Sequence, residues 1–312
     1  MAHGSDGLGS IRIPAAQCGL VGVKPTQNRN PGGPDDRGRA HGLVVDHVLT
    51  RTLRDSAAML DWTGYAEDDA PYAPIPKVRP YTDEIQTPPG KLRIAFSTEV
   101  PRKTPPHPDV QAVFDATVKL LGELCHTMME KTKFAVDWRR LYRAQGAVSG
   151  AMFAASIDDW TKVLGREPDE ADMEPLAWAS YRGSKKLSSS QIGEGMQNLR
   201  LGCRQVLALW RDFDVLLSPV TLAPPPRIGH LDPVNVEPRE FNRRQSFVFG
   251  YTPPFNMTGQ PSLSLPLGQS KDGLPIGMMF TSRIGDEAVL YRLAAQLEEA
   301  QPWKDRRPMV WG

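Results

Sequence analysis

Apolar residues recur along the chain at two spacings, which predict strands and helices in alternation. Short apolar or alternating runs are typical of strands, and apolar residues every three or four positions are typical of helices. The predicted strands are residues 20–23, 43–49, 92–96, 215–218, 262–266 and 276–280, and the predicted helices are residues 15–18, 52–62, 109–124, 138–164, 173–182, 192–213 and 286–300. Gly146 and Gly150 are expected to interrupt the longest helix. A strand followed by a helix at this spacing favours an α/β architecture.

The stretches between these elements are rich in proline, glycine and polar residues, so we expect loops at the surface. The longest are residues 24–42, 66–90 and 219–238. The turn at residues 271–273 separates the last two strands and predicts a β-hairpin. A length of 312 residues allows one large domain or about two ordinary ones.

Composition narrows the classes of function. The 37 basic and 36 acidic residues give a net charge of +1, which does not indicate nucleic acid or an anionic membrane as a partner. No apolar run approaches the roughly 20 residues of a membrane span, and the polar, glycine-rich start is unlike a signal peptide. Three scattered cysteines, Cys18, Cys125 and Cys203, favour free thiols in a reducing compartment, and we expect a cytoplasmic location.

The opening stretch, residues 2–15, carries glycines at positions 4, 7 and 9, followed by Ser10. Successive peptide N–H groups with little side-chain cover can point at one anion. A serine beside such a site has the placement that nucleophilic acyl transfer needs. The G-x-S-x-G elbow, the phosphate-binding P-loop, the dinucleotide fingerprint and the H-E-x-x-H motif are all absent. The glycine-rich loop alone is therefore a weak signal.

Several segments, taken together, are more specific. Their combination closely resembles the amidase signature family, and residues 41–57 are most similar to hydrolases of 6-aminohexanoate cyclic dimer within it. The segments that carry the resemblance are residues 4–15, 18–26, 47–57, 214–219, 253–261 and 272–277.

The resemblance implies a fold and a site. The fold is α/β, with a mixed central sheet flanked by helices on both faces, and residues 1–312 form a single domain that lacks its N-terminal part. Ser10 matches the acylated nucleophile, and the backbone N–H groups of Gly7, Leu8, Gly9 and Ser10 match the oxyanion hole. In the family, a lysine and a serine joined by a cis peptide relay protons. Both lie upstream of the nucleophile, in sequence that this chain does not contain, so truncation is expected. No metal or organic cofactor is required.

Two positions qualify the resemblance. Leu8 stands where the family normally has glycine or alanine, so its side chain is expected to crowd the acyl pocket or shift the loop. Lys24 matches a lysine that the family carries in a structural segment, so we do not expect it to replace the upstream lysine.

Other polar and apolar residues near these motifs have simpler interpretations. Asp6 and Arg12 are expected to hold the loop through hydrogen bonds and an ion pair. Met278 and Met279 are expected in the core. Residues 255–257 fit either the lining of an acyl pocket or a turn that packs against the site.

We therefore interpret the chain as an amidase that hydrolyses the C–N amide bond of a small-molecule substrate through an acyl-enzyme on Ser10. Without the upstream residues, the chain alone is expected to be inactive or severely impaired. One alternative is a non-catalytic remnant that binds a ligand or a partner chain. Another is an aminoacyl-tRNA amidotransferase-type subunit, which the near-neutral charge disfavours. The expected partners include a homo-oligomer or a complementing N-terminal chain, but no nucleic acid and no membrane.

Overall fold

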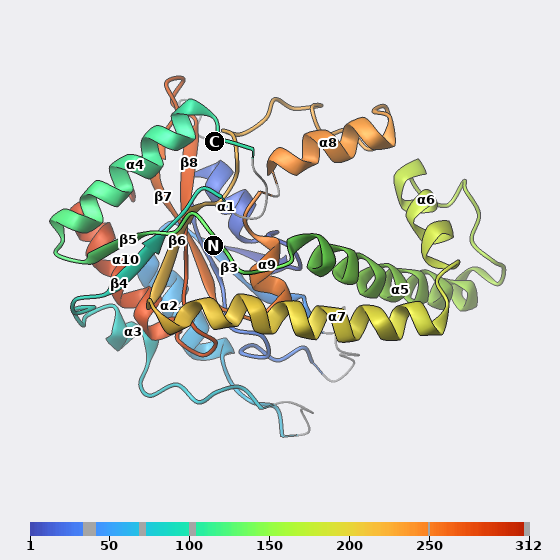
Figure 1. The fold of residues 1–312 in the computed structure, drawn as a ribbon, viewed down its shortest axis with the longest axis horizontal. Helices are drawn as coiled ribbons and strands as arrows, with labels where there is room; N and C mark the ends of the chain where they lie inside the picture. The colour runs from blue at the N-terminus through green and yellow to red at the C-terminus, as the bar shows by residue number, and fades with distance from the viewer. Residues whose placement is uncertain (34–41, 69–72, 100–103, 249, 309–312) are drawn as a thin grey trace. The chain divides into compact units, whose positions relative to one another are not determined.

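The computed structural model describes residues 1–33, 42–68, 73–99, 104–248 and 250–308 (Figure 1). The chain divides into two compact units. The sheet unit comprises residues 1–134, 208–225 and 248–312, and the helical unit comprises residues 135–207 and 226–247. The expectation of a single domain remains a prediction, and the two units are described separately.

A mixed sheet forms the centre of the sheet unit. Its strands, within the described residues, are β1 (Ala2–Asp6), β2 (Val21–Lys24), β3 (Val45–Thr50), β4 (Arg93–Phe96), β5 (Thr127–Glu130), β6 (Val215–Pro219), β7 (Ser262–Gln269) and β8 (Pro275–Thr281). They lie in the order β1-β3-β2-β7-β8-β6-β4-β5. The β6, β4 and β5 strands pair in parallel, and the other neighbours pair antiparallel. The predicted mixed sheet is confirmed, and so is the predicted hairpin, as β7 and β8.

The central strands alternate between two covered faces. One face carries Leu263 and Leu265 of β7 with Met278 and Phe280 of β8, all almost fully buried in the main apolar core. Three helices close this core, and Figure 1 shows them along the sheet: α2 (Leu53–Thr63), α4 (Pro108–Glu123) and α10 (Glu287–Ala300). The intervening residues point to the opposite face, because successive side chains in a strand alternate.

The opposite face carries α1 (Arg12–Cys18), which contacts β2, β7 and β8. Met279 lies on this side, where Arg12 approaches its sulfur at 3.5 Å. Helices therefore cover both faces of the sheet, as predicted, and both Met278 and Met279 are fully buried.

Two glycines let α1 lie close against the sheet. A Cβ atom on Gly277 would be 2.5 Å from the Cβ and 2.8 Å from the Cα of Ala16, and one on Gly22 would be 2.5 Å from the Cβ of Ala15. The helix ends at Gly19, whose φ of 68° is in the left-handed region and whose N–H donates to the Ala15 carbonyl. Because α1 begins two residues after Ser10, this close packing fixes the position of the preceding loop.

The helical unit contains α5 (Trp138–Leu164), α6 (Pro175–Ser184), α7 (Ser189–Leu207) and most of α8 (Pro238–Val248). The predicted bounds of α5 are confirmed, but Gly146 and Gly150 do not interrupt it. The α5 helix packs against both α6 and α7. A Cβ atom on Gly150 would lie 2.6 Å from Ser184 Oγ, so this glycine serves the close approach of two helices instead of a break.

Some elements differ from the sequence-based expectations. The loops expected at 24–42 and 66–90 include residues 34–41 and 69–72, which lie outside the described residues, and the second also contains the short helix α3 (Tyr81–Glu84). The helix expected at 192–213 begins at Ser189 and continues after Leu207 as a 3₁₀ turn. No prediction covered β1, β5, α8 or α9 (Pro253–Met257).

Two further expectations from the sequence concern membrane-spanning segments and the cysteine thiols. None of the helices in the described part of the chain has the length and apolar character that a bilayer crossing needs. None of the three cysteines, all within the described residues, forms a disulfide; Cys18 and Cys125 are exposed and Cys203 is half-buried.

The packing of α1 can be tested with a pair of glycine substitutions. Gly277→Ala forces α1 and β8 apart, so it is expected to lower the free energy of unfolding by about 1–3 kcal/mol. Gly193→Ala in α7 meets no atom within 4 Å and is expected to raise it by up to about 1 kcal/mol, because alanine favours a helix. Urea denaturation of both variants measures the difference. Equal effects would contradict the close packing of α1 on the sheet.

Candidate active site

The loop that carries Ser10 connects β1 to α1. Asp6, the last residue of β1, is fully buried, whereas Ser10 is exposed between the buried residues Gly9 and Ile11. The Ile13 N–H donates to the Gly9 carbonyl at 2.8 Å, so the first turn of the helix forms directly behind Ser10. The serine hydroxyl is therefore presented at the surface of a loop whose base is in the protein interior.

A buried ion pair holds this loop. Arg12 Nε donates to Asp6 Oδ2 at 2.9 Å and Arg12 Nη2 donates to Asp6 Oδ1 at 2.9 Å, and neither side chain is exposed to solvent. Two parallel bonds between a guanidinium and a carboxylate fix distance and orientation together. The predicted role of Asp6 and Arg12 in holding the loop is confirmed.

Two residues far along the chain complete the network. Arg12 also donates to Asn256 Oδ1 at 2.6 Å and to the Thr252 carbonyl at 2.9 Å. In return, Asn256 Nδ2 donates to the Asp6 carbonyl at 2.8 Å and to the Leu43 carbonyl at 3.1 Å. Thr252 was missed in the sequence, and Asn256 was placed near the site without this contact. The lining of an acyl pocket by residues 255–257 remains a prediction.

The backbone at Gly9 requires glycine. Its φ is 135°, and a Cβ atom there would overlap the Thr252 hydroxyl. That hydroxyl donates to the Leu8 carbonyl at 2.6 Å, so the loop is fixed from the side of α9 as well. The Leu8 and Gly7 residues themselves are half-buried.

The N–H groups predicted for an oxyanion hole are not equivalent. The Gly9 N–H donates to Asp6 Oδ1 at 2.7 Å, so in this conformation it holds the loop and faces the protein interior. Gly7, Leu8 and Ser10 remain as the predicted donors to a substrate oxygen. The arrangement differs from the four-donor expectation because the Asp6 carboxylate needs several donors when it is buried.

The network strongly stabilises the negative charge of the Asp6 carboxylate. Burial alone would raise the pKa of its carboxyl group, but the Arg12 guanidinium, the nearby Lys24 ammonium and the Asn256 amide outweigh burial and lower the pKa to about 2. Asp6 is therefore ionised throughout the physiological range, and the ion pair does not titrate there.

Lys24 is the last residue of β2 and is fully buried. Burial and the nearby Arg12 guanidinium lower the pKa of its ammonium group to about 7. Its Nζ donates to the Pro25 carbonyl at 2.9 Å. The structural role expected from the sequence remains a prediction, and the charge of protonated Lys24 helps to lower the pKa of Asp6.

No basic side chain in the described residues accepts a hydrogen bond from the Ser10 hydroxyl, and these residues contain no cis peptide bond. The proton-relaying lysine and serine that the sequence resemblance places upstream therefore remain a prediction. What the described residues provide is an exposed serine on a loop that the buried Asp6–Arg12 pair holds.

Comparison with known proteins gives a consistent result. The family model described as Amidase matches residues 1–290. The 6-aminohexanoate-cyclic-dimer hydrolase of Paenarthrobacter ureafaciens is 32% identical over 321 residues, which cover 99% of this chain and 65% of that relative. The chain thus spans slightly less than two thirds of the length of that relative.

Solved structures agree with the sequence comparison. A structure of 6-aminohexanoate cyclic dimer hydrolase in complex with substrate matches with a TM-score of 0.88 at 30% identity, over 99% of this chain and 66% of the other. A bacterial aryl acylamidase of the amidase signature enzymes matches with a TM-score of 0.82 at 22% identity, over 99% and 65%. The second match supports the fold alone.

Loss of the buried cation is expected to be costly. Arg12→Met leaves the Asp6 carboxylate buried without its partner, so the free energy of unfolding should fall by about 3–5 kcal/mol. The matched control is Arg93→Met, which removes the ion pair with Asp214 at the surface and should cost much less, because solvent screens an exposed pair. Urea denaturation measures both. Similar losses in the two variants would show that burial does not decide the effect.

The lowered pKa of Lys24 is expected to make the protein more stable as the pH rises above 7. Its pKa is about 7 in the folded protein and close to that of a free lysine in the unfolded chain, so between these values the unfolded state binds more protons. Stability therefore rises as pH increases above 7, by up to about 1.4 kcal/mol per pH unit. Lys24→Met should remove this slope. The test is urea denaturation of both proteins from pH 7 to pH 9, and parallel curves would contradict it.

Proposed function

Because the chain belongs to the amidase family, we propose that it contributes Ser10 as the nucleophile for hydrolysis of a C–N amide bond in a small-molecule substrate. The observation that carries the proposal is the exposed Ser10 on a loop fixed by the buried Asp6–Arg12 pair. The loop is rigid, and its serine is accessible, which is what a preorganised acyl-transfer site requires. The similarity to the 6-aminohexanoate-cyclic-dimer hydrolase from Paenarthrobacter ureafaciens favours a cyclic amide of an amino acid as the substrate class.

The proposed reaction has two stages. Ser10 Oγ forms a bond to the amide carbonyl carbon while its proton passes to a base. The C–N bond then breaks, and the leaving nitrogen takes up a proton, which produces an amine and an ester on Ser10. Water attacks this ester, releases the carboxylic acid and restores the Ser10 hydroxyl. The N–H groups of Gly7, Leu8 and Ser10 stabilise the oxyanion in both stages.

Proton transfer needs a group beyond those described. Lys24 has the lowered pKa of a potential base, but its side chain is buried and its Nζ donates to the Pro25 carbonyl. We therefore assign it to the support of the loop. We propose that a lysine and a serine from polypeptide that precedes Gly4 in the longer family members act on Ser10, either in the same chain or as a complementing segment.

The alternative of a non-catalytic binding protein follows from the same observation. Without an activating base, a serine hydroxyl is a weak nucleophile. The described residues would then supply a rigid binding loop without turnover. The two functions differ in whether Ser10 reacts.

A fluorophosphonate probe tests the nucleophile. In the presence of a complementing N-terminal segment, wild-type protein is expected to be labelled at Ser10, identified by peptide mass spectrometry, and Ser10→Ala should lose the label. The matched control is Ser5→Ala, because Ser5 is an exposed serine on β1 in the same segment and should leave labelling unchanged. In the presence of a complementing N-terminal segment, Ser10→Ala should lower the rate of amide hydrolysis by at least about 10³-fold.

The possible results separate the alternatives. A label that persists in Ser10→Ala would contradict the assignment of the nucleophile. A folded wild-type protein that stays unlabelled in the presence of that segment would favour the non-catalytic binding function.

A further inference from the structure

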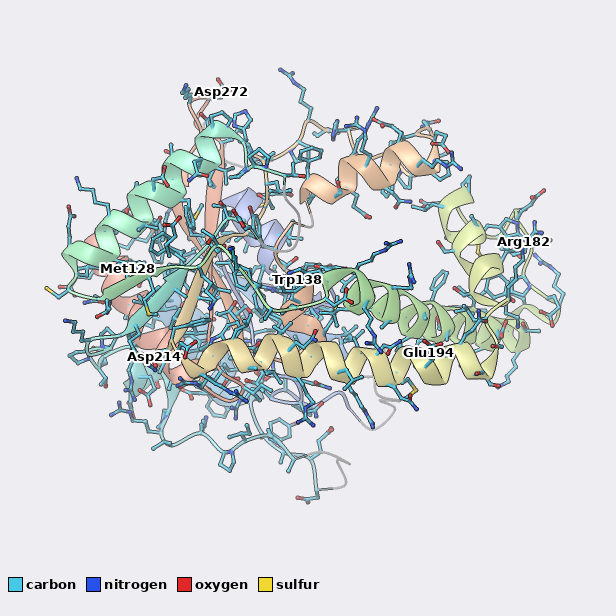
Figure 2. All side chains as sticks on the ribbon, in the orientation of Figure 1. Met128, Trp138, Arg182, Glu194, Asp214 and Asp272 are labelled. Atoms are coloured by element: carbon cyan, nitrogen blue, oxygen red, sulfur yellow. The ribbon has the colours of Figure 1, made fainter. Side chains whose placement is uncertain are left out.

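A concave site lies within the helical unit. It is a cavity of about 770 Å³, and it is lined by residues of α5 and α7, the segment that joins α6 to α7, and the residue before α5. Figure 2 labels Trp138 at the start of α5 and Glu194 on α7, the two helices that pack side by side. Ala144, Ala147 and Gly195 are among the small residues that leave room between them.

Three arginines contribute positive charge to the lining of this cavity. Arg139, Arg140 and Arg143 all line it and are exposed, and they occupy the first two turns of α5. Arg139 and Arg143 are four residues apart, and Arg140 and Arg143 are three apart, so the guanidinium groups lie on neighbouring positions of one helix surface and repel each other. Cations at the N-terminal end of a helix are also unfavourable with respect to its dipole. The free protein therefore gains no stability from this arrangement of charges.

The nearby carboxylates do not neutralise the arginines. Asp137 Oδ1 accepts the backbone N–H of Arg140 at 3.0 Å as the helix cap, and Glu194 Oε1 accepts from Asn198 Nδ2 at 3.4 Å. Within the described part of the chain, none of the three arginines forms an ion pair with a carboxylate. Two carboxylates face three guanidinium groups, so the lining retains an excess of positive charge.

One of the arginines is already held in place. Arg140 donates to Asn198 Oδ1 from Nε at 3.0 Å and from Nη2 at 2.6 Å, which links α5 to α7 across the cavity. Arg139 and Arg143 have no such partner within the described residues. The cavity thus combines one positioned guanidinium with two that are available to a ligand.

We propose that this cavity binds a small organic anion through a carboxylate or phosphate group held by Arg139 and Arg143. Guanidinium groups match the geometry of both anions and bind them with two parallel hydrogen bonds. The volume is in the range of about 300–1,000 Å³ that small-molecule sites occupy, so it accommodates more than an inorganic ion. Gln191 on α7 adds an amide that can donate to the rest of the ligand. The proposal does not depend on reaction at Ser10.

Isothermal titration calorimetry of the whole chain tests the proposal, with citrate and inorganic phosphate as probes at constant ionic strength. At least one probe is expected to bind saturably to the wild type with a dissociation constant below about 1 mM. The Arg139→Gln/Arg143→Gln double variant should bind at least ten times more weakly. Citrate and phosphate distinguish a carboxylate from a phosphate as the group recognised.

The controls distinguish binding in this cavity from a general effect of charge, from a loss of folding and from binding at Ser10. Arg182→Gln/Arg200→Gln removes two exposed arginines of α6 and α7 that do not line the cavity and should bind within twofold of the wild type. Ser10→Ala should also bind like the wild type. Circular dichroism checks that each variant folds, and the single variants Arg139→Gln and Arg143→Gln serve if the double variant does not.

Two results would overturn the proposal. The first is equal binding by the wild type and the arginine double variant. The second is the absence of saturable binding of both probes up to about 10 mM.

Discussion

The Asp6 carboxylate and the Arg12 guanidinium face each other in the interior of the sheet unit, where neither reaches solvent. A charge in such a place is costly unless it is paired and its remaining hydrogen-bonding capacity is satisfied. Asp6 satisfies its oxygens with Arg12, Asn256 and the Gly9 N–H, and Arg12 uses the Thr252 carbonyl as well. Each of these bonds restricts the loop that carries Ser10. The requirement to compensate one buried carboxylate therefore determines the conformation of the candidate site.

The two faces of the sheet have different roles. One packs the apolar core, and the other supports the helix that follows Ser10. The face with α2, α4 and α10 carries the large apolar residues of the main core. The face with α1 uses smaller side chains, and Gly22 and Gly277 leave room for the helix that follows Ser10. A strand presents alternate residues to opposite sides, so the same short segments of β2 and β8 serve both purposes.

Much of the fold could be predicted from the sequence because long periodic segments determine their own structure. The bounds of α5, the hairpin of β7 and β8, and α10 follow from apolar spacing. The β1 strand could not be predicted in this way, because its sequence Ala-His-Gly-Ser-Asp lacks alternating apolar residues and its pairing with β3 is a tertiary contact.

The candidate site was likewise predictable only in part. Ser10, Asp6 and Arg12 lie within one short segment, so their association could be inferred from the local sequence. Thr252 and Asn256 lie more than 200 residues away, and nothing in a single sequence indicates which distant polar groups satisfy a buried ion pair. The burial of Lys24 was also not apparent, since a lysine that ends a strand is usually exposed. The engagement of the Gly9 N–H by Asp6 required the geometry of the loop.

The separation between Arg12 and Thr252 along the chain has a consequence for biosynthesis. The Ser10 loop leaves the ribosome well before the groups that fix it, which are added about 240 residues later. At roughly 5–20 residues per second, the nascent chain carries Asp6 and Arg12 without their partners for at least about ten seconds. The ordered loop is therefore among the last parts of the sheet unit to form, and a ribosome that stalls before α9 leaves Ser10 on an unsupported segment.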